Sequence, residues 1–152
     1  MRKSTMNAAL VICLILFGKS FDSAGNISFV HKEILVEDEP SMAFLRKLQG
    51  KYPYDVKLFN SQALSTRLKK LLGNRYQYMV KTWAVEIPIE IKNNLFVASG
   101  CEQHNCGATN FIIVYDFAKN NLSVGVREED KVKTYSEDGS NSPRVLQWVN
   151  NY

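Results

Sequence analysis

One seven-residue stretch constrains the fold more than any other part of the chain. It runs from Cys101 to Gly107 and contains two of the three cysteines and one of the two histidines. The segments on either side, 94–100 and 108–117, are rich in apolar residues and read as strands. Gly100 and Gly107 bracket the stretch. The pattern predicts an exposed loop that joins the two strands of a long antiparallel hairpin.

The first 20 residues have the pattern of a secretory signal peptide. Two basic residues precede an apolar run over 8–17, and small residues stand before a cleavage position after Ser20. A second candidate cleavage position follows Ala24. The apolar run is about half as long as the roughly 20 residues that a membrane-spanning helix needs. We therefore expect a periplasmic or secreted protein with no membrane segment after cleavage, and a single domain over 21–152.

Cleavage changes what the charges and the cysteines imply. The chain has 19 basic and 15 acidic residues, and the signal peptide contains three of the basic ones and no acid. The nearly neutral remainder argues against a nucleic-acid partner, because nucleic-acid readers keep a concentrated basic face. Cleavage also removes Cys13, so that only Cys101 and Cys106 remain. In an oxidising compartment, an isolated pair five residues apart predicts a disulfide.

Apolar residues at helical spacing recur in the first half of the mature chain. They predict a helix that begins after Ser41 and another that begins after Ser61 and ends at Gly73. A further helical pattern near Tyr76 is either a third helix or a continuation of the second that bends at Gly73 and Asn74. Proline is favoured in the first turn of a helix, so a last short helix is predicted from Pro143 onward. The residues expected to face the core from this last helix are Leu146 and either Trp148 or Val149.

From residue 83 onward the apolar residues alternate with a period of two, which is typical of strands. The predicted strands cover 85–92, 95–99, 111–117, 122–126 and 132–135. The first of these contains Pro88, which cannot donate to a ladder, and so belongs at a sheet edge. The predicted fold class is α+β: an antiparallel meander of about four to five strands, with helices packed on one face and a protruding, disulfide-closed loop.

The loop resembles the C-K-P-H-D-C-G motif of the inhibitor of vertebrate lysozyme (Ivy) family. Four positions match and three differ: the matches are Cys101, His104, Cys106 and Gly107, and the differences are Glu102, Gln103 and Asn105. The layout of helices followed by a strand meander extends the resemblance over 41–128. It implies an α+β domain whose loop pushes its histidine into the active-site cleft of a lysozyme. Dimerisation is known in the family, which leaves a homodimer as an open alternative.

His104 suits a cleft that is lined by carboxylates. Retaining glycosidases hold two carboxyl groups roughly 5 Å apart, and one of the two is protonated. One imidazole nitrogen can donate to the ionised group while the other accepts from the protonated one. The resemblance implies an inhibitor of lysozyme or of a related peptidoglycan-cleaving muramidase. Its target-binding residues would be His104, Glu102, Gln103 and Asn105.

The differing positions bear on the identity of the target. Gln103 stands where the family motif has proline, so more conformational entropy is lost when the loop docks. Glu102 adds a negative charge, which a carboxylate-lined cleft repels unless the side chain points outward or meets a basic residue. Another cell-wall hydrolase is therefore an alternative target. The chain would then be an immunity-type or structural binding protein.

Other chemistries find less support in the sequence. Structural zinc has four ligands, so a metal site at Cys101, His104 and Cys106 would need a further residue such as His31. The C-x4-C spacing differs from the C-x-x-C of thiol oxidoreductases. The sequence has no nucleophile elbow, no H-E-x-x-H and no phosphate-binding loop. We expect no enzyme activity, no cofactor and no metal. A structural disulfide beside an incidental histidine would keep the fold and remove the function.

Overall fold

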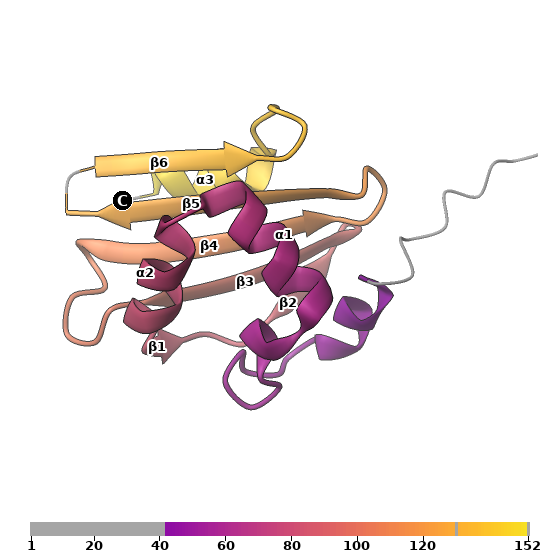
Figure 1. The fold of residues 1–152 in the computed structure, drawn as a ribbon, viewed down its shortest axis with the longest axis horizontal. Helices are drawn as coiled ribbons and strands as arrows, with labels where there is room; N and C mark the ends of the chain where they lie inside the picture. The colour runs from indigo at the N-terminus through magenta and orange to yellow at the C-terminus, as the bar shows by residue number, and fades with distance from the viewer. Residues whose placement is uncertain (1–41, 130, 152) are drawn as a thin grey trace, which may run out of the picture. The chain divides into compact units, whose positions relative to one another are not determined.

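The structure is a computed structural model that describes residues 42–129 and 131–151 (Figure 1). The predicted signal peptide, the predicted helix start at Ser41, and His31 lie outside these residues. The elements, in chain order, are η1 (Ala43–Leu48), η2 (Leu58–Asn60), α1 (Gln62–Leu72), α2 (Arg75–Thr82), β1 (Val85–Glu86), β2 (Glu90–Lys92), β3 (Leu95–Cys101), β4 (Thr109–Asp116), β5 (Asn121–Glu128), β6 (Lys131–Ser136) and α3 (Pro143–Asn150).

The strands form one antiparallel sheet in the order β1-β3-β4-β5-β6, and β2 also pairs with β3. β1 and β2 are two pieces of the predicted strand over 85–92, and its predicted place at the sheet edge is confirmed. Pro88 lies between the two pieces. The residue after it, Ile89, bonds to Gly50 and Lys51, which follow η1. The Ile89 N–H donates to the Lys51 carbonyl at 2.8 Å, and the Ile89 carbonyl accepts from the Gly50 N–H at 2.8 Å.

This break in the edge strand changes the direction of two side chains. The period-two pattern predicts Val85 and Ile87 on the core face, but both are exposed, and only Ile89 of this stretch is fully buried. The reason is that the strand is broken at Pro88, so the alternation changes face there: Val85 and Ile87 lie beside α3, whereas Ile89 joins the core under α1 and α2. The edge therefore presents apolar side chains to solvent.

The helices α1 and α2 cover one face of the sheet (Figure 1). Leu64 and Leu68 of α1 and Met79 of α2 are buried against strand residues such as Phe111 and Tyr115. Gly73, at φ +55°, ends α1, so α1 and α2 are separate helices. The predicted α+β class, with an antiparallel sheet and a disulfide in its loop, is confirmed.

The last helix, α3, lies on the other face of the sheet, so the helices are not confined to one face. Val145 and Trp148 pack against Ile112 and Val114, whereas Leu146 is 42% exposed. The prediction that Leu146 faces the core is wrong. Val145 faces the core instead, because Trp148 fills the space above Gly125. A Cβ atom at Gly125 would lie 2.4 Å from the Trp148 ring. None of the helices in residues 42–129 and 131–151 has both the length and the hydropathy of a membrane span.

Candidate functional site

The loop over 102–108 connects β3 to β4 at the end of the sheet where β1 begins (Figure 1). Cys101, the last residue of β3, is disulfide-bonded to Cys106, and their Cα atoms are 4.9 Å apart. The predicted disulfide is thus confirmed. Cys101 also pairs in the sheet with Asn110 of β4, so one end of the bond is fixed to regular structure. The disulfide closes the loop at its base and leaves the tip to be shaped by hydrogen bonds.

Two consecutive turns shape the backbone of this loop. In the first, the Asn105 N–H donates to the Glu102 carbonyl at 3.1 Å. In the second, the Asn105 carbonyl accepts from the N–H groups of Ala108 and Thr109, at 3.1 and 2.8 Å. His104 is the third residue of the first turn and has a φ of +62°. Left-handed backbone at that position is typical of a type II turn, and histidine adopts it more readily than most residues.

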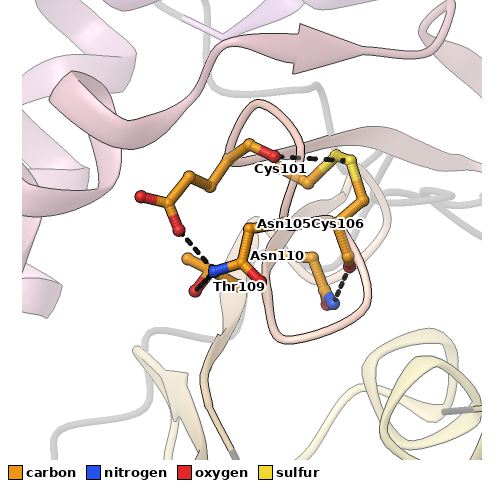
Figure 2. The surroundings of a disulfide bond; sticks show 6 residues. Cys101, Asn105, Cys106, Thr109 and Asn110 are labelled. Carbon is orange, nitrogen blue, oxygen red and sulfur yellow. Dashed lines mark hydrogen bonds between the residues drawn. A yellow bond between two sulfur atoms is a disulfide. The ribbon is translucent and has the colours of Figure 1, made fainter.

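The Asn105 side chain holds the first turn from inside the loop (Figure 2). Its Nδ2 donates to the Glu102 carboxylate at 2.7 Å and to the Thr109 hydroxyl at 3.2 Å. The Glu102 carboxylate is therefore turned back onto the loop. A hydrogen bond to a charged acceptor is worth more than one between neutral groups. The pair explains how a glutamate is accommodated beside the tip.

A second asparagine holds the other side of the loop. The Nδ2 of Asn110 donates to the Cys106 carbonyl at 2.7 Å (Figure 2). Thr109 and Asn110 are the first two residues of β4, both buried, and adjacent strand residues point to opposite faces of a sheet. The loop is thus bonded from both faces. The sequence signal for these contacts is a pair of polar residues, Thr109 and Asn110, at the start of an otherwise apolar strand.

The helix α2 places charged and aromatic groups beside the base of the loop. Burial raises the pKa of the Tyr78 hydroxyl, and the nearby carboxylates of Glu128 and Glu102 raise it further. Arg75 forms an ion pair with Glu128, and its guanidinium lies 5.7 Å from the centre of the Tyr78 ring. No sequence pattern indicates a role for Arg75, Tyr78 or Glu128. Tyr78 therefore lies near the carboxylates of both β5 and the loop.

The two residues at the tip behave differently from those at the base. Gln103 and His104 are exposed, and across residues 42–129 and 131–151 their side chains make no hydrogen bond or ion pair. Of the predicted target-binding residues, Glu102 and Asn105 bond to each other, although Asn105 is also exposed. His104 and Gln103 are exposed and make no such bond within the described residues.

The two glycines that bracket the loop are not equivalent. Gly100 is buried, and a Cβ atom there would lie 2.2 Å from the ring of Trp83. Trp83 in turn stacks on Phe111, with ring centres 5.9 Å apart. A Cβ atom at Gly107 would have no neighbour within 4 Å. Gly100 therefore lets the core reach the base of the loop, whereas Gly107 has no steric requirement for glycine.

The disulfide bears on the metal alternative. A bonded cysteine has no thiolate to offer a metal ion, so Cys101 and Cys106 are not ligands in this state. In the part of the chain that the structure describes, no three His, Cys, Asp or Glu side chains are grouped to hold an ion.

Comparison with known proteins bears on the family of this chain. No curated protein and no solved structure matches the chain. A family model described as inhibitor of vertebrate lysozyme (Ivy) matches residues 63–152, which is more than half of the chain and includes the entire loop, the sheet and both α-helical layers. The chain belongs to the inhibitor of vertebrate lysozyme (Ivy) family.

Proposed function

We propose that this protein inhibits a lysozyme or a related muramidase by inserting the 102–108 loop, with His104 at its tip, into the active-site cleft. Members of the family are inhibitors of lysozyme and not enzymes, so a muramidase is the expected partner. The observation that supports loop insertion is that the residues of the loop differ in their bonding. Glu102 and Asn105 bond to each other, while Gln103 and His104 are exposed.

The chemistry of the tip fits a cleft with two carboxyl groups. Muramidases of the retaining kind hold these groups roughly 5 Å apart, with one ionised and one protonated. A neutral imidazole donates from one nitrogen and accepts at the other, so it can satisfy both groups at once. Because the Glu102 carboxylate is bonded to Asn105, its negative charge is drawn back from the tip. The repulsion that the sequence predicts for Glu102 is reduced accordingly.

The rigidity of the loop supports affinity. A loop that is already in its bound shape loses less conformational entropy on docking. The family motif has proline where this chain has Gln103, but the two turns, the disulfide and the bonds from Asn105 and Asn110 restrict the same segment. A rigid loop is therefore available without the proline.

The compartment of the target follows from the same reading. Family inhibitors are periplasmic or secreted, and the first 20 residues of this chain have the pattern of a signal peptide. We place the encounter outside the cytoplasm, where a disulfide persists and where peptidoglycan-cleaving enzymes act.

The test is a binding and inhibition assay of the mature protein against vertebrate C-type and G-type lysozymes and bacterial lytic enzymes. Interface hot spots cost about 2 kcal/mol or more on truncation, so His104→Ala should weaken binding about thirtyfold or more. His104→Lys should also fail, because lysine has no acceptor nitrogen.

Two controls make the result specific to the imidazole. His104→Gly removes any strain of alanine at φ +62°, and it should lose as much affinity as His104→Ala. Gln103→Ala changes the neighbouring exposed residue and should have a small effect. Melting temperatures confirm that every variant is folded. Wild-type affinity in His104→Ala, or no binding of the wild type to any enzyme of the panel, would contradict the proposal.

A further inference from the structure

The edge of the sheet beside the loop carries an unusual share of the exposed apolar surface. Five large hydrophobic side chains are exposed among the described residues, and four of them belong to two neighbouring segments at this edge. These four are Tyr52 (45%), Tyr54 (83%), Val85 (40%) and Ile87 (57%). The segments are joined by the Tyr54 N–H, which donates to the Glu86 carboxylate at 2.9 Å. Clustered exposed apolar residues mark interaction sites more often than scattered ones do.

This apolar edge is continuous with the base of the loop. Val85 pairs in the sheet with Cys101, the residue at which the loop begins, and the Ala84 N–H donates to the Cys101 carbonyl at 3.0 Å. A groove of about 430 Å³ runs from Cys101 along Val85 and Ile87. Trp148 and Arg144 of α3 form its other wall. A molecule that encloses the loop would therefore meet Val85 and Ile87 next.

The size of the loop makes such a second contact necessary. A stable protein interface buries roughly 800 Å² on each partner and uses about 20 to 30 residues a side. The loop over 102–108 has seven residues, which is about a quarter to a third of that number. An inhibitor that used only the loop would fall well short of a standard interface. The remaining contact must come from surface beside the loop.

We infer that the edge patch, defined here as Val85 and Ile87 with the groove beside them, is a second contact surface for the same muramidase, and that it packs against the rim of the cleft. This inference rests on the proposed function. The chemistry fits: the groove is lined by the apolar side chains of Val85, Ile87 and Trp148 together with charged residues, Glu86 and Arg144, and interfaces combine apolar centres with polar rims. The occupant is thus a protein surface with an apolar rim beside a carboxylate-lined cleft.

The experiment measures dissociation constants of edge-patch variants against a vertebrate C-type lysozyme and the other enzymes of the panel. Ile87→Ser should weaken binding about tenfold, and Val85→Ser combined with Ile87→Ser should weaken it further. The matched control is Leu146→Ser, since Leu146 is 42% exposed but is not part of the groove. It should bind like the wild type. Because Ile87 and Leu146 are both exposed, neither change should lower the melting temperature appreciably.

The outcomes separate this inference from the proposed function. If His104→Ala loses affinity while Ile87→Ser does not, the loop acts without the edge patch and only the inference is overturned. If no enzyme of the panel binds the wild type, both are overturned. Sedimentation of the free protein supplies the other decisive arm: if Ile87→Ser converts a dimer to a monomer and leaves enzyme binding unchanged, the patch joins two copies of this chain, which contradicts the inference.

Discussion

The two connections that flank strand β4 each contain a residue with left-handed backbone, and they differ in how that residue's side chain is bonded. At one end, the loop over 102–108 places His104 in left-handed backbone at φ +62°; at the other, the turn over 117–120 places Asn120 there at φ +48°. The Asn120 side chain accepts from Arg67 of α1 and from the Tyr115 hydroxyl, each at 2.8 Å. The His104 side chain makes no such bond within the described residues.

A turn that stabilises the fold and a loop that presents a side chain differ in where their hydrogen bonds are made. Asn120 is held by Tyr115 of β4 and by Arg67 of α1, and Arg67 also donates to the Asn120 carbonyl and to Glu137. Around His104 the bonds are made by the loop's own residues and by the first two residues of β4. In the first arrangement the side chain of the turn residue stabilises the fold. The second fixes the backbone and leaves the side chain at the tip exposed.

The largest effect is expected where the loop meets the core. Gly100→Ala should destabilise the protein by about 3 kcal/mol, because the new Cβ atom would lie 2.2 Å from the buried Trp83 ring, and overpacking costs roughly 1 to 3 kcal/mol. Gly107→Ala, at the other side of the loop, should change stability by less than about 0.5 kcal/mol. Urea unfolding of both variants measures the difference. Equal stabilities would show that the loop base is not fixed by the core.

The turn at the other end of β4 should affect stability and leave target binding unchanged. Arg67→Ala removes bonds to Asn120 and Glu137, and bonds to charged groups contribute roughly 1.5 to 3 kcal/mol. We expect a loss of about 2 kcal/mol, and no change in the dissociation constant for the muramidase. Lys70→Ala, an exposed residue of the same helix, is the control and should be neutral. A change in target affinity without a loss of stability would overturn the comparison.

The sequence predicts what depends on local pattern. The strands on both sides of the loop, the glycine that ends α1 and the disulfide pair are all found where the periodicity and the cysteine count place them. Two consecutive asparagines, Asn93 and Asn94, predict a tight turn because asparagine adopts positive φ readily, and both do, with φ values of 50° and 61°.

The sequence did not predict what depends on packing between distant segments. Val85 and Ile87 have the pattern of core residues, but the hydrogen bonds of Ile89 to residues 50 and 51 interrupt the edge strand after them, so that Ile89 is buried while Val85 and Ile87 are exposed. Leu146 has the same apolar character as Val145, and only the position of Trp148 on the sheet decides which of the two is buried. The contact between Glu102 and Asn105 likewise depends on the turn geometry, which no spacing rule specifies.

The smallest effect concerns Glu102, where charge and shape act in opposite directions. Removing a unit charge about 7 Å from a carboxylate in water gains roughly 0.6 kcal/mol, or about threefold in affinity. Glu102→Gln removes the charge but keeps an oxygen that can accept from Asn105, so its affinity for a carboxylate-lined cleft should rise about threefold at low salt. Glu102→Lys adds a positive charge but has no acceptor, so Asn105 loses its partner within the first turn.

We therefore expect Glu102→Lys to bind less tightly than Glu102→Gln, although charge alone predicts the reverse order. Dissociation constants at about 10 mM and 150 mM salt separate the two contributions, because the screening length shortens from about 30 Å to about 8 Å. The gain in Glu102→Gln should shrink at the higher salt concentration, whereas the deficit of Glu102→Lys relative to Glu102→Gln should persist, since it arises from loop shape. If Glu102→Lys binds best at both concentrations, the hydrogen bond between Glu102 and Asn105 does not control the presentation of His104.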